Sequence, residues 1–98
     1  MKLTEKLDKI LEENLRYTVF KLSISNTLED RQELNNLGEL NKYLSKANGN
    51  YIVVAIKDKG AMAKMVSMNR GEKQHTSPIS KNQHSGIFKK LKDMEFAV

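Results

Sequence analysis

The stretch YIVVAIKDKGAMAKMVSM, residues 51–68, decides the fold because it predicts two strands and the turn between them. Its first part, residues 51–57, is apolar on both faces, as expected of a central strand that is covered on each side. The segment KDKG, residues 57–60, matches a type I turn followed by a left-handed glycine, and the residues after it continue as the returning strand. The sequence therefore predicts an antiparallel hairpin in the middle of a sheet.

Two elements are predicted before this hairpin. From Tyr17 the hydrophobic period is two, since Phe20, Leu22 and Ile24 alternate with polar residues, and this predicts a strand over residues 17–25 with one face in water. Upstream of it, apolar residues recur at the spacing of one helix face, with Glu and Lys on the other face. The residues of this predicted N-terminal helix are Leu3, Leu7, Ile10, Leu11 and Leu15.

A second helix is predicted between the two strand regions. Thr27 and Asp30 resemble a capping box, which would begin the helix directly after the first strand. Residues 35–38 include two Asn and one Gly, which are poor helix formers, so a kinked helix or two short helices fit the pattern as well as one straight helix does. The apolar stripe of this helix consists of Leu34, Leu37, Leu40 and Leu44.

The region after the hairpin predicts a turn, an edge strand and a last helix. Residues 68–71 repeat the turn chemistry, so residues 72–77 form either a short polar edge strand or a plain loop. Pro78 lacks a ladder donor and marks an exposed connection. The final helix has apolar residues on one face and lysines mostly on the other, and its apolar residues are Ile87, Phe88, Leu91 and Met94.

These elements predict an α+β fold, with a small mixed or antiparallel sheet of three to four strands packed against helices. The expected order is α-β-α-β-β-(β)-α, in one domain over residues 1–98, because no linker divides the chain. If the strands at residues 17–25 and 51–57 are neighbours, the helix between them makes them parallel, with a right-handed crossing. A chain this short has a thin stability margin, and both a monomer and a homodimer are compatible with it.

The charge of the chain is one-sided. The formal net charge is +5, and Lys and Arg balance Asp and Glu at 8 each over residues 1–49, against 9 basic and 4 acidic residues over 50–98. Such a distribution favours a polyanionic partner, while solubility alone is the competing explanation. The chain has no Cys and no apolar run of bilayer length, so we expect a protein of the reducing cytoplasm without disulfides or membrane association.

No motif predicts catalysis, a cofactor or a metal. His75 and His84 are nine residues apart, which matches no common zinc-ligand spacing. The chain has no nucleophile elbow, no P-loop and no dinucleotide fingerprint. We therefore assign no catalytic residue, cofactor or metal ligand, and we expect no enzyme.

The candidate binding residues are the basic side chains after the hairpin. They can neutralise phosphates without reading a base sequence, although with one Arg they offer little bidentate guanine recognition. A solvated lysine face is the equally weighted alternative. The series consists of Arg70, Lys73, Lys81, Lys89, Lys90 and Lys92.

Three functions follow from these patterns. The first is a small non-enzymatic regulator or accessory protein that binds nucleic acid through its basic C-terminal half. The second is a protein-binding modulator or inhibitor that uses the N-terminal helix or a Met-rich sheet, although Met62, Met65 and Met68 are more simply explained as core. The third comes from Arg70, Lys73 and His75 and from the element order, which resembles small ribosome-dependent ribonuclease toxins and implies a nuclease.

Overall fold

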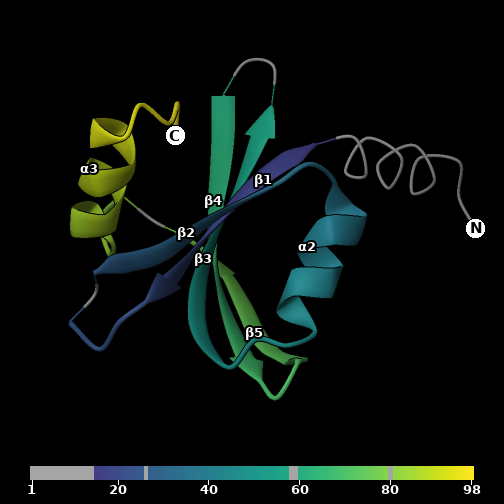
Figure 1. Cartoon of the computed structure of the whole chain (residues 1–98). Coiled ribbons are helices and arrows are strands. Elements are labelled where there is room, and N and C mark those ends of the chain that lie inside the picture. The colour runs from purple at the N-terminus through teal and green to yellow at the C-terminus, as the bar shows by residue number, and fades with distance from the viewer. Residues whose placement is uncertain (1–14, 26, 58–59, 80) are drawn as a thin grey trace, which may run out of the picture.

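The computed structural model describes residues 15–25, 27–57, 60–79 and 81–98, so the predicted N-terminal helix lies outside the described residues except for Leu15. Within these described ranges, five strands form one sheet, and two short helices accompany it (Figure 1). The elements are β1 (Arg16–Leu22), β2 (Leu28–Leu34), α2 (Leu37–Leu44), β3 (Gly49–Lys57), β4 (Gly60–Asn69), β5 (Glu72–Pro78) and α3 (Ser85–Asp93).

The sheet is larger than the sequence predicted, and every strand pair in it is antiparallel. Its strand order is β2-β1-β3-β4-β5. The predicted fold of three to four strands packed against helices is therefore wrong, because the described chain is mostly sheet with helices of only 8 and 9 residues. The hairpin of β3 and β4 is confirmed by continuous pairing from Gly49 with Met68 to Lys57 with Gly60.

The predicted sheet lacked a strand because residues 28–34, expected to begin a helix, form β2. Leu28 lies opposite Leu22 and Leu34 lies opposite Tyr17, so both leucines gain apolar partners on β1. A turn from Leu22 to Leu28 reverses the chain, and β1 ends three residues earlier than predicted. β2 follows β1 in the chain and runs antiparallel to it. The expected parallel crossover is therefore absent, and β1 pairs antiparallel with β3.

The poor helix formers before α2 define where that helix begins. Asn36 is the N-cap, and its Oδ1 accepts a hydrogen bond of 2.9 Å from the Glu39 amide. Glu39 Oε2 in turn accepts a bond of 2.8 Å from the Asn35 amide, which resembles a capping box. The helix forms predicted from the sequence for residues 27–48 are all wrong, because residues 28–34 form β2 and only Leu37–Leu44 are helical, with Leu40 and Leu44 buried.

Each face of the sheet has its own core and its own helix (Figure 1). On one face, Leu40 and Leu44 of α2 belong to the same buried cluster as Val19 and Val53. On the other face, the predicted last helix is present as α3, and its buried residues join the cluster of Phe20, Ile52 and Val54. The buried residues of α3 are Ile87 and Leu91. We call these surfaces the α2 face and the α3 face.

The three methionines of β4 are divided between the two faces. Met68 is buried in the α2-face cluster, and Met65 packs against the α3-face cluster. Met62, on the α2 face with Val66 and Met68, remains 49% exposed. The methionines therefore contribute mainly to the cores and form no common exposed surface.

Candidate functional site

The predicted basic series is divided into two separate groups by the fold. Arg70 and Lys73 lie at the turn between β4 and β5, which is at the bottom of the sheet in Figure 1. Lys89, Lys90 and Lys92 lie on α3, on the opposite side of the sheet from α2 and away from that turn (Figure 1). Lys81 is exposed in the connection that leads to α3. The six residues consequently do not form one site.

A bulge in the sheet further separates Lys73 from His75. The register of β4 and β5 shifts between Ser67, which lies opposite His75, and Met68, which lies opposite Lys73. Directly opposed residues point to the same face, so Lys73 is on the α2 face while His75 is on the α3 face. Without the bulge, residues two apart on one strand would share a face.

The turn between β4 and β5 is held against the loop that follows α2. The Gly71 amide donates a hydrogen bond of 2.9 Å to the Ala47 carbonyl, and the Arg70 amide donates one of 3.2 Å to Asn48 Oδ1. Arg70 has φ 50° and Gly71 has φ 82°, as in the type I′ turns that suit hairpin twist. A Cβ on Gly71 would collide with the Ser45 carbonyl, so the close approach requires glycine.

This contact joins parts of the chain that carry basic residues, because it places the turn that contains Arg70 against the segment that follows Lys46. Lys42 and Lys46 are exposed on and just after α2, four residues apart, so they lie on one side of it. The held turn adds Arg70, and the bulge directs Lys73 to the same face. We call Lys42, Lys46, Arg70 and Lys73 the basic surface.

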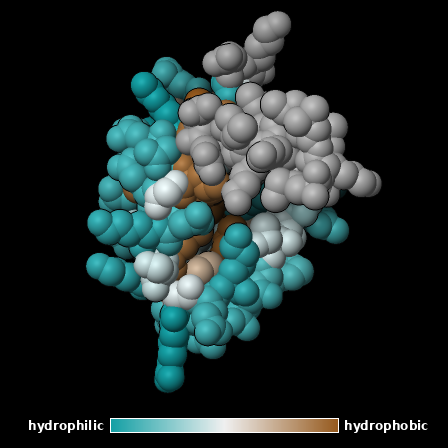
Figure 2. Space-filling view, turned by 90° about the vertical axis from the view of Figure 1, so that its right-hand side faces the viewer, coloured by the Kyte–Doolittle hydropathy of each residue, from teal (hydrophilic) through white to brown (hydrophobic). Residues whose placement is uncertain are grey.

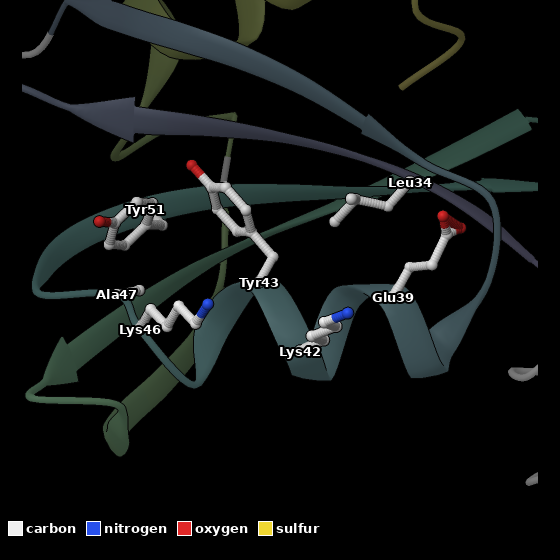
Figure 3. A pocket seen from close by; sticks show the side chains of 7 residues that line it. All are labelled: Leu34, Glu39, Lys42, Tyr43, Lys46, Ala47 and Tyr51. Carbon is white, nitrogen blue, oxygen red and sulfur yellow. The ribbon is translucent and has the colours of Figure 1, made fainter.

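The basic surface borders a cavity of about 460 Å³ between α2 and the sheet. Figure 3 shows the Tyr43 ring between Tyr51 and Leu34, with the lysines extending from the helix side and Glu39 at the opposite end from Lys46. The lining residues are Leu34, Glu39, Lys42, Tyr43, Lys46, Ala47 and Tyr51. On the side of the molecule seen in Figure 2, apolar side chains are visible in a hollow between hydrophilic ones.

The two tyrosines of the cavity have fixed orientations. Their ring centroids are 6.3 Å apart at an interplanar angle of 89°, which is the edge-to-face arrangement that aromatic pairs favour. The Tyr51 hydroxyl donates to the Asn48 carbonyl at 3.3 Å. Burial, and secondarily Tyr51 and Asp30, raise the pKa of Tyr43 above its ordinary value of 10.0. The Tyr43 side chain therefore stays neutral at physiological pH.

Glu39, which lines the cavity, and Glu33 on β2 both have partners outside the basic surface. The Glu39 carboxylate accepts the bond from Asn35 described above, so it is already engaged at the start of α2. Glu33 is ion-paired with Arg31 at 2.9 Å on the edge strand β2. Within the described part of the chain, no ion pair joins a carboxylate to Lys42, Lys46, Arg70 or Lys73.

Lys42, Lys46, Tyr43 and Tyr51 are not among the residues predicted from the sequence. The N-terminal half of the chain, which contains the two lysines, has a net charge of zero because its acidic and basic residues balance. The fold separates most of those charges, since Glu29, Asp30 and Glu33 are on β2 while Lys42 is on α2 and Lys46 just after it. The sequence feature that could have indicated these candidates is the pair Lys42 and Lys46, four residues apart with Tyr43 between them.

Comparison with protein-family models, with curated proteins and with solved structures finds no match for the chain. The described residues define a fold class, a five-stranded antiparallel sheet with a short helix on each face. In the described ranges, no helix is both long and apolar enough to cross a membrane. Among the same residues, no group of three His, Cys, Asp or Glu side chains is placed to hold a metal ion.

Proposed function

We propose that the chain is a small non-enzymatic nucleic-acid-binding regulator or accessory protein that contacts phosphates through its basic surface. The observation that carries the proposal is the contact of the β4–β5 turn with the loop after α2, in which the Arg70 amide is hydrogen-bonded to Asn48, two residues after Lys46. Rigidly positioned cations lose less conformational freedom on binding than cations on a mobile loop. Such cations bind phosphates by charge and release counterions, without requiring a particular base sequence.

The proposed phosphate contacts are only partly those predicted from the sequence. Arg70 and Lys73 belong to the predicted series, whereas Lys42 and Lys46 do not. The lysines of α3 and Lys81 become a secondary region, because they lie on the other side of the sheet. Arg70 contributes the guanidinium that can bind a phosphate with two parallel hydrogen bonds.

A salt titration with two matched triple variants tests the proposal. Lys46→Ala/Arg70→Ala/Lys73→Ala and Lys81→Ala/Lys89→Ala/Lys92→Ala each remove three positive charges. We expect the first to weaken oligonucleotide binding by roughly 10- to 100-fold at low salt and to reduce the salt slope by about 2 to 3. The second should change the slope by less than about 1.

Two outcomes would contradict the proposal. Equal losses in the two variants would mean that net charge, and not the basic surface, governs binding. No binding by the unaltered protein at low salt would remove nucleic acid as the partner.

The protein-binding alternative has one supporting observation. Ile56 and Met62, near the β3–β4 turn, are 36% and 49% exposed, which offers a small apolar contact. They lie on opposite faces of the hairpin, because Met62 is paired with Ala55 and Ile56 with Ala61. Two separated side chains form a smaller contact than the contiguous patches typical of protein interfaces, so this alternative remains second.

A further inference from the structure

The cavity beside the basic surface combines an aromatic interior with a cationic rim. Leu34, Ala47 and Tyr51 contribute apolar surface from the sheet side, and the Tyr43 ring is half-buried among them. The volume of about 460 Å³ is within the range of cavities that hold small organic groups. A flat, mainly apolar ring is the shape that can pack against a tyrosine face here.

The charges at the rim favour an anion attached to that ring. Lys42 and Lys46 are exposed at the mouth, while the one lining carboxylate, Glu39, is engaged by the Asn35 amide. A neutral apolar ligand would use the ring surface but leave both ammonium groups without a partner. A free phosphate would use the lysines but leave the tyrosines unused.

The cavity is continuous with the phosphate-binding residues proposed above. Lys46 belongs to both, and Ala47, which lines the cavity, accepts the Gly71 hydrogen bond that holds the turn carrying Arg70. A phosphate chain crossing Arg70 and Lys73 would therefore reach the cavity mouth at Lys46. An unpaired base can turn out of the strand and enter the cavity at this point, whereas a base of a duplex must first break its pairing and stacking.

We propose that the cavity takes one unstacked base of a single-stranded nucleic acid, stacked against Tyr43, with the neighbouring phosphates on Lys42 and Lys46. This inference rests on the proposed function and specifies its partner as single-stranded. Aromatic stacking accepts any base, so no strong sequence preference is expected. Tyr43 is the residue that distinguishes single strands from duplexes.

The test compares three probes of equal length at one low salt concentration: a single strand, a duplex, and a single strand of abasic sugar phosphates. We expect the single strand to bind roughly 5- to 100-fold more tightly than the abasic strand, which corresponds to stacking of one base. Tyr43→Leu should remove this advantage and leave abasic binding unchanged. Tyr43→Phe, which keeps the ring, should preserve it.

The outcomes separate this inference from the proposed function. Equal binding of the single strand and the abasic strand by the unaltered protein would overturn the base-binding cavity while leaving the phosphate contacts intact. An unchanged single-strand advantage in Tyr43→Leu would also overturn it. Absence of binding to all three probes would overturn both. The comparison of the single strand with the abasic strand uses the unaltered protein, so it tests the base-binding cavity even if the Tyr43→Leu variant does not fold.

Discussion

The two faces of the sheet carry similar short helices but differ in what their charged side chains can reach. On the α3 face, the Arg31 guanidinium lies over the rings of Phe20 and Phe96, at 5.9 Å and 5.3 Å from their centroids, so its aromatic groups already have a cation from the same chain. On the α2 face, Tyr43 borders an open cavity with lysines at its rim. The number of lysines alone is therefore a poor indicator of a binding site. The two faces differ in whether their aromatic rings are already covered by a cation of the same chain or border an open cavity.

The largest effect should come from breaking the contact that assembles the basic surface. Gly71→Ala places a Cβ against the Ser45 carbonyl at φ 82°, so the turn must move away from the loop after α2. We expect a loss of about 2 to 4 kcal/mol in the free energy of unfolding, measured by denaturant titration.

The matched control for this glycine lies on the other face. Gly86 in α3 has nothing near its Cβ position, so Gly86→Ala should stabilise the protein by up to about 1 kcal/mol. A similar stability for the Gly71→Ala variant and the unaltered protein would mean that the turn can separate from the loop at no cost. The proposed role of that contact would then be wrong.

An intermediate effect is expected at the start of α2. Asn36→Ala removes the acceptor for the Glu39 amide, which should cost about 1 kcal/mol of unfolding free energy. Asn36→Ser keeps a side-chain acceptor and should lose only a few tenths of that value. Thermal or denaturant unfolding measures both. Equal losses in the two variants would indicate that the cap hydrogen bond is not what stabilises this helix.

The smallest effect is expected at His75. The bulge directs it to the face opposite Lys73, and the basic surface does not include it, so His75→Ala should change oligonucleotide affinity by less than about 2-fold. A nuclease would instead need an acid or base and a charge stabiliser that converge on one phosphate. RNA cleavage by the purified protein, with or without ribosomes, that His75→Ala abolishes would make the nuclease hypothesis the leading one.

The sequence by itself determined the elements whose signals are local. The hairpin of β3 and β4 follows from a β-branched run, a glycine turn and a returning run, and all of these lie within residues 51–68. The edge strand β5 follows from the turn chemistry of residues 68–71, although a loop was an equal alternative. In α3, the apolar spacing correctly gave the buried face of Ile87 and Leu91.

Only the tertiary structure decided β2, the strand order and the candidate site. The sequence of residues 27–34 fits a capped helix as well as a strand, and pairing of Leu28 and Leu34 with β1 selects the strand. The bulge that directs Lys73 to the α2 face and the contact of Gly71 with Ala47 join residues from separate elements. Such long-range pairings leave no periodic signal within a short window, which is why Lys46, Arg70 and Tyr43 could be brought into one site only by the folded chain.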